Sequence, residues 1–335
     1  MKKRKTVIFA ILTAILLISA AISLLLGRYG ISLRQCLGIF ASLFVNIEPF
    51  WTKTQANMLL LVRAPRVIIA VLAGMALCVA GSSYQCIFKN PLAAPHILGA
   101  STGAAFGAAL AILNGFDSTV ITVCAFIASL VCVALVILVS RLCRGERVMG
   151  LVLSGIMIGS LFSAATSYLK LIADPNSTLP AITYWMMGSC AGADADELGF
   201  VWIPMLIALV PILALRWKMN ILTLNDDEAR SMGVNTAAVR GVVIVCATLL
   251  TAASVSVCGV IGWVGLVIPH LARRLVGNDC RVLIPASALL GGSFLVIVDD
   301  LARALYTTEL PLGVLTAFIG APFFIYLMAR KGVND

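Results

Sequence analysis

The sequence predicts an all-helical integral membrane protein with about ten transmembrane helices, and three observations support this. Hydrophobic residues make up 61% of the 335 residues, charged residues only 12%, and the mean hydropathy is +1.05. A soluble domain has roughly 45–50% apolar and 25% charged residues. Apolar runs long enough to cross a bilayer recur along the whole chain, and short basic clusters separate many of them. This pattern excludes a cytosolic enzyme, a secreted disulfide scaffold and a disordered chain.

The apolar runs predict the individual helices and leave no room for a separate soluble domain, so residues 1–335 are expected to form one transmembrane domain. The runs are 6–26, 64–84, 94–113, 118–140, 148–171, 198–215, 241–258, 264–276, 282–304 and 312–329. The first run could belong to a signal peptide. It is 21 residues long, more than a usual signal h-region, so we interpret it as an uncleaved helix.

The basic residues predict the orientation of the helices. Ten crossings place both termini on one side, and with the N-terminus inside, 17 of the 24 Lys and Arg residues lie inside and 7 outside. This bias predicts N-in and C-in. The same placement argues against nucleic-acid binding. Two outer segments, 27–62 and 172–197, are long enough to contain structure of their own.

One inner segment, residues 216–240, has an unusual composition. Within it, residues 226–234 mix charges with Ala229, Met232 and Gly233. This pattern is typical of a short amphipathic helix that ends at a glycine. Such a helix can dock into a groove of a partner. The alternative is a solvated connection between two membrane helices.

Small residues at four-residue spacing mark two helix faces. One face carries Gly99, Gly103 and Gly107, and the second, on the fifth predicted helix, carries Gly155, Gly159 and Ser163. In lipid, such faces let helix backbones approach closely. They indicate ordinary bundle packing, and they could also line a subunit interface or a transport pathway.

The cysteines and histidines do not predict a metal site. Five of the ten cysteines lie inside apolar runs and no pair has CxxC spacing, so we expect reduced thiols that pack as small apolar groups. The chain has only two histidines, His96 and His270, and both are expected to be structural.

A transporter needs an energy source, and the sequence contains no GxxxxGK[ST] motif for ATP phosphates. Asp299 and Asp300 lie in an apolar run and are candidates for ion coupling. Arg303 lies four residues after Asp299, so a local ion pair is the competing interpretation. An enzyme that binds Mg²⁺–diphosphate would need a second Asp-rich helix, which the sequence lacks.

Five segments, in order, resemble the FecCD-type permeases, the membrane subunits of type II ABC importers for iron–siderophore, haem and cobalamin. They are LVRAPR at 61–66, KNPLAAPHILG at 89–99, EARSMGV at 228–234, GVIGWVGLVIPH at 259–270, and ELPLG at 309–313 followed by GAP at 320–322. Departures are mild: Ala94, His96 and Val260 replace more usual residues. The resemblance covers residues from about 60 to 325.

The resemblance implies a type II ABC importer permease fold in the cell (plasma or inner) membrane. It implies a second permease subunit (a homodimer or a paralogue), two cytoplasmic ABC ATPases that bind ATP and Mg²⁺, and an extracytoplasmic substrate-binding protein. The chain itself is expected to bind no cofactor or metal and to be no enzyme. The expected cargo is an iron chelate (ferric siderophore or haem). Cobalamin is the alternative, and an ion-coupled secondary transporter that uses Asp299 or Asp300 is the alternative from another class.

The resemblance also implies three groups of site residues. The ATPase-coupling residues are Asp227, Glu228, Ala229, Arg230, Ser231, Met232, Gly233 and Val234. Binding-protein docking is expected at the outer residues Arg63, Arg66 and Arg303, with local pairing to Asp299 as the competing role for Arg303. Pathway or interface candidates are Gly155, Gly159 and Ser163, because the fifth and tenth helices of the family border the translocation route.

Overall fold

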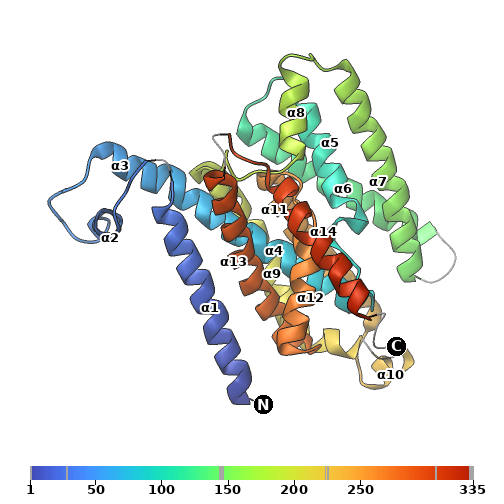
Figure 1. The fold of residues 1–335 in the computed structure, drawn as a ribbon. Coiled ribbons are helices and arrows are strands. Elements are labelled where there is room, and N and C mark those ends of the chain that lie inside the picture. The colour runs from blue at the N-terminus through green and yellow to red at the C-terminus, as the bar shows by residue number, and fades with distance from the viewer. Residues whose placement is uncertain are drawn as a thin grey trace.

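The protein is a bundle of helices in a computed structural model that describes residues 2–27, 29–142, 147–222, 224, 226–305 and 308–331 (Figure 1). Within these ranges no strand occurs. The helical elements are α1 (Lys2–Leu25), α2 (Leu33–Ser42), α3 (Lys53–Asn57), the π-helical η1 (Met58–Arg63), α4 (Ala64–Ile87), the 3-10 helix η2 (Pro95–Leu98), α5 (Ala100–Leu113), α6 (Ser118–Leu142), α7 (Arg147–Ile172), α8 (Thr178–Met186), α9 (Ala195–Ile221), α10 (Asp226–Ser231), α11 (Thr236–Cys258), α12 (Val264–Val276), α13 (Cys280–Ala304) and α14 (Leu312–Lys331).

Each of the ten predicted helices has a counterpart, which confirms the all-helical membrane fold. Among the described residues, seven helical spans are long and apolar enough to cross a membrane. They are 4–25, 53–87, 118–142, 148–172, 195–221, 236–258 and 280–304. The other three predicted helices correspond to α5, α12 and α14, of which α5 and α12 have only 14 and 13 residues.

Helix α4 forms the centre of the bundle and packs against α9, α11, α12 and α13. Two of its glycines allow this contact. A Cβ on Gly74 would collide with the carbonyl oxygen of Gly291 in α13, and a Cβ on Gly81 would collide with that of Gly265 in α12. Lipid supplies no hydrophobic force between helices, so close backbone approach is what holds them together. The glycines therefore fix the position of α12 and α13 on α4.

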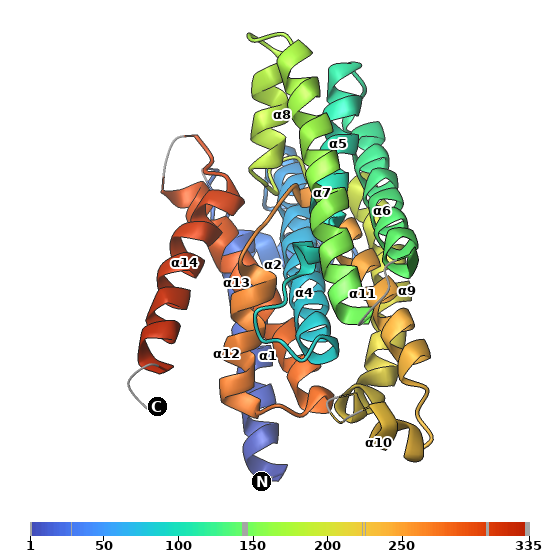
Figure 2. The ribbon, with the colours of Figure 1, turned by 90° about the vertical axis from the view of Figure 1, so that its right-hand side faces the viewer.

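The start of α1, the end of α14 and α10 lie at one end of the bundle, and α8 lies at the opposite end (Figure 2). This arrangement agrees with the predicted return of the C-terminus to the N-terminal side. The two outer segments contain the structure expected of them, α2 and α3 in the first and α8 in the second. Capping boxes start α2 at Ser32 and α3 at Thr52, and their Gln35 and Gln55 side chains hydrogen-bond each other at 3.3 Å.

The chain is irregular between α11 and α12, inside the bundle. Helix α11 ends at Gly259 (φ 64°), and α12 begins after Trp263, a non-glycine residue at φ 67°. The Ser189 amide donates to the Cys258 carbonyl at 2.8 Å, and the Leu312 amide donates to the Gly188 carbonyl at 2.8 Å. Irregular backbone at membrane depth is tolerated only where protein covers it. Here the segments around α8 and α14 provide that cover.

The cysteines pack as predicted. The nine cysteines within the described residues are free thiols, and all except Cys124 are buried. Cys143 lies outside the described residues.

The contact at Gly81 predicts a large effect of a small substitution. We expect Gly81→Ala to lower the melting temperature of the purified protein in detergent, because the added methyl group must push α4 away from α12. Gly199→Ala, in α9, is the matched control, since a Cβ there meets open space. Alanine also favours helix over glycine. Equal melting temperatures for the two variants would contradict the proposed contact.

Candidate functional site

The outer end of the bundle contains a buried cluster of charges centred on Arg66 in α4. The Arg66 guanidinium donates to Asp299 through Nε at 3.0 Å and through Nη2 at 2.9 Å. It donates to Glu309 through Nη1 and Nη2, both at 2.9 Å. The side chains of Arg66 and Asp299 are 8% and 1% exposed, whereas Glu309 is 30% exposed. One guanidinium thus joins α4, α13 and the connection that leads to α14.

Arg303 completes this cluster on α13. It pairs with Asp300 and lies 3.4 Å from Asp299, measured from Nε to Oδ2. The Ser23 hydroxyl in α1 donates to Asp300 at 2.7 Å, and Arg303 Nη2 donates to the same hydroxyl at 2.7 Å. A buried charge is tolerated when it is paired and hydrogen-bonded. The cluster therefore ties α1 to α13.

Arg63, the third predicted docking residue, lies in the π-helical turn η1. Its Nη1 donates to the carbonyl oxygens of Leu24 and Leu25 at 2.9 and 3.2 Å, and its Nη2 donates to the carbonyl of Tyr29. Leu24 and Leu25 belong to the last turn of α1, where backbone carbonyls lack helical partners, and Tyr29 lies just beyond the helix. Arg63 thus closes the outer end of α1.

The structure therefore brings the three outer arginines to one end, but it turns their charges inward. Local pairing of Arg303 with Asp299, the alternative left open by the sequence, is present. Docking of a binding protein by these arginines stays a prediction. Sequence reasoning missed the roles of Ser23 and Glu309. The available sequence signal for Glu309 was an acidic residue in the outer connection that follows Asp299, Asp300 and Arg303.

The predicted coupling residues form a helix at the inner end. The predicted helix is confirmed as α10, and Gly233 follows it at φ 76°. Ala229 is fully buried and Val234 is 5% exposed, while Met232 is 55% exposed. The Lys89 ammonium, from the connection after α4, donates to the carbonyl of Leu224 at 2.6 Å. Residues 223 and 225 of this segment, and the side chain of Asp227, lie outside the described part.

The pathway candidates on α7 do not share one environment. Gly155 and Gly159 are buried, and a Cβ on Gly155 would collide with the carbonyl of Ile97 in η2. Gly159 lies against Gly99. These two glycines therefore serve helix packing within this chain, the first of the two interpretations above. Ser163 is exposed on the outer surface of α7. Whether it faces a pathway or an interface stays a prediction.

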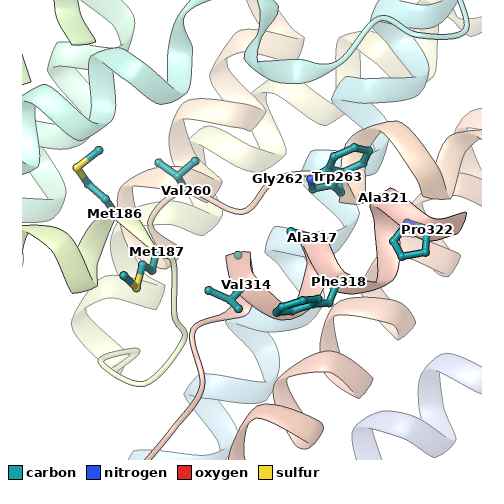
Figure 3. A pocket seen from close by; sticks show the side chains of 11 residues that line it. Met186, Met187, Val260, Gly262, Trp263, Val314, Ala317, Phe318, Ala321 and Pro322 are labelled. Atoms are coloured by element: carbon teal, nitrogen blue, oxygen red, sulfur yellow. The ribbon is translucent and has the colours of Figure 1, made fainter. Parts of the chain in front are cut away.

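A cleft of about 670 Å³ lies between α14, the end of α8 and the irregular segment before α12 (Figure 3). Its side chains are mainly apolar and include Met187, Val260, Trp263, Val314 and Phe318. Its lining contains no charged side chain. The cleft can therefore accept a bulky apolar surface but offers no charge to hold a small ion. Among the described residues, no three His, Cys, Asp or Glu side chains gather in an arrangement that could hold a metal.

Sequence comparison assigns the chain to a known family. The sequence profile of the FecCD transport family matches residues 15–330. A molybdate import system permease protein of Haemophilus influenzae is 39% identical over 329 residues, which cover 97% of this chain and 96% of that protein. An iron chelatin transport system permease protein of Helicobacter pylori is 35% identical over 321 residues, or 94% of this chain and 96% of that protein.

Structural comparison agrees. A solved inward-facing structure of a metal-chelate type ABC transporter matches 97% of this chain and 99% of its own, with a TM-score of 0.86 and 38% identity. This chain therefore belongs to the FecCD transport family and is a multi-pass membrane permease of an ABC importer.

Proposed function

We propose that the chain carries a metal chelate, specifically an iron chelate such as a ferric siderophore or haem, through the membrane. The observation that supports this cargo is the cleft beside α14, whose volume is about 670 Å³ and whose lining is uncharged. A chelate encloses its metal in a large organic ligand. Its passage therefore requires a wide route more than it requires charged side chains along that route. A hemin transport permease of Yersinia pestis, 37% identical over 285 residues (81% of this chain and 82% of that protein), supports the same class.

A specific observation favours a second candidate cargo, the molybdate of the Haemophilus influenzae relative. A small oxyanion is usually held by positive charge and hydrogen-bond donors. The uncharged cleft lining disfavours such a site in this subunit. Cobalamin, the remaining alternative within the family, fits the same wide cleft as an iron chelate does, and a cobalamin import permease of Halobacterium salinarum is 37% identical over 82% of this chain.

Ion-driven secondary transport is disfavoured by family membership and by the charge cluster. Asp299 and Asp300, its candidate titrating groups, are paired with Arg66 and Arg303 in the structure. We propose instead that two separate ATPase subunits drive alternating access through α10. Burial of Ala229 fixes α10 to the bundle, and exposure of Met232 leaves an apolar side chain for a groove in the ATPase.

We further propose that the outer charge cluster receives the substrate-binding protein. Because Arg66 already holds two carboxylates, an acidic side chain of the binding protein must compete with one of them. Glu309 is the easier of the two carboxylates to displace, because its side chain is 30% exposed and that of Asp299 is 1% exposed. The subunit would pair with a second copy or a paralogue to complete the pathway.

The coupling role of α10 predicts loss of the ATPase from the complex. We expect Met232→Asp to reduce the amount of co-purified ATPase at least about tenfold, as expected for an apolar interface anchor. Ala237→Asp, at an exposed position in the first turn of α11, is the control and should retain the ATPase. Equal recovery with both variants would show that α10 does not contact the ATPase.

The docking role predicts a gain in affinity when the internal competitor is neutralised. Glu309→Gln should strengthen binding-protein capture about two- to fivefold at low salt, the range of one exposed ion pair. The gain should shrink as salt screens the charges. Glu48→Gln, in the exposed outer connection between α2 and α3, is the control and should change nothing. An affinity for Glu309→Gln that matches the unchanged protein at every salt concentration would refute this role of Arg66.

Cargo is tested by uptake into proteoliposomes that contain the permease with its ATPase and binding protein. We expect ATP-dependent accumulation of a radioactive iron chelate and no accumulation of molybdate. Val314→Trp, which narrows the cleft, should slow chelate uptake while ATP hydrolysis without cargo continues. Uptake of molybdate, with the iron chelate excluded, would overturn the proposed cargo and leave the importer function standing.

A further inference from the structure

A second cavity, separate from the cleft, opens on the outside of the bundle. It is a groove of about 460 Å³ between α1, α4, α9, α11 and α13. All of its lining residues are apolar, among them Phe9, Leu72, Trp202, Leu213 and Pro285. Trp202 is 46% exposed, so the groove faces away from the bundle and toward lipid.

The length of the groove matches one leaflet of a bilayer. Trp202 and Leu213 line it eleven residues apart on α9. At 1.5 Å per residue this distance is about 16 Å. The hydrocarbon core of a bilayer is about 30 Å thick, so the groove covers about half of it.

Basic side chains lie beyond the inner end of the groove on three of its five helices. Lys5 precedes Phe9 by four residues in α1, Arg216 follows Leu213 by three in α9, and Arg281 precedes Pro285 by four in α13. Residues three or four apart share a helix face. Because α9 runs inward while α1 and α13 run outward, all three basic residues lie on the inner side of the groove.

A direct contact joins two of these three basic residues. Arg216 Nη1 donates to the carbonyl of Arg281 at 3.4 Å. Arg281 also pairs with Asp279 at 3.1 Å, and this pairing lowers the pKa of Asp279 to about 2, so the carboxylate stays charged. Three cations and one anion give this end of the groove a net charge of +2. The neighbouring Trp217 is 49% exposed, as is typical of an aromatic residue at a membrane interface.

We propose that this groove binds an anionic phospholipid of the inner leaflet. One acyl chain lies along the apolar groove, and the phosphate lies among Lys5, Arg216 and Arg281. The charge of the basic end selects this occupant, because basic pockets between membrane helices on the cytoplasmic side bind anionic headgroups. A zwitterionic lipid brings a cation together with its phosphate and therefore leaves the net positive charge of this end uncompensated. An apolar helix of another subunit has no charge to offer to the three cations.

Native mass spectrometry of the purified full-length chain tests the proposal with two lipids that have the same acyl chains, phosphatidylglycerol and phosphatidylcholine. We expect preferential retention of one phosphatidylglycerol. The double variant Arg216→Gln/Arg281→Gln should weaken its binding about fivefold for each charge removed. Ala288→Phe, which fills the groove, should prevent retention without changing any charge. Lys218→Gln is the control, because Lys218 lies about 140° around α9 from Leu213.

Three results would overturn the proposal. Equal retention of both lipids would exclude headgroup selection. Equal weakening by Lys218→Gln and by Arg216→Gln/Arg281→Gln would show general attraction to a basic surface instead of a site. A dimer that carries no lipid and that dissociates with Ala288→Phe would show that a helix of a second copy covers the groove.

Discussion

Close approach of helix backbones at α4 is the constraint on which the rest of the structure depends. A helix in lipid gains nothing from hiding apolar side chains, so contact must come from packing. Gly74 and Gly81 let the backbones of α13 and α12 reach α4 directly. This placement in turn positions the irregular segment at 259–263 beside α14, where the cleft forms.

The charge cluster at the outer end makes a second long-range connection. Arg66 and Asp299 are 233 residues apart in sequence, and both are almost fully buried. Removing one partner of such a pair leaves an uncompensated buried charge, which is much more costly than the pair is stabilising. The cluster therefore holds the outer ends of α1, α4 and α13 together. Glu309, its partly exposed carboxylate, is the partner that the proposed contact with a binding protein would displace.

The inner end is built differently, from a short helix held by apolar burial. Ala229 and Val234 fix α10, and Lys89 joins the preceding loop to the connection after α4. A movement of α10 would thus be transmitted toward the central helix α4 in two ways. One is the hydrogen bond from Lys89 to Leu224, and the other is the packing of Ala229 and Val234 in the bundle. This arrangement is consistent with the coupling role that we propose for α10.

The sequence by itself determined the all-helical membrane fold, the place of all ten helices and the glycine-terminated helix α10. These features depend on local composition and on hydrophobic length, which a short window of sequence contains. Only the tertiary structure decided how the glycines and charges are used. Gly155 faces Ile97, and Arg66 selects Asp299 and Glu309. The physical reason is that such partners are chosen by the packing of segments far apart in sequence, where many pairings satisfy the same local pattern.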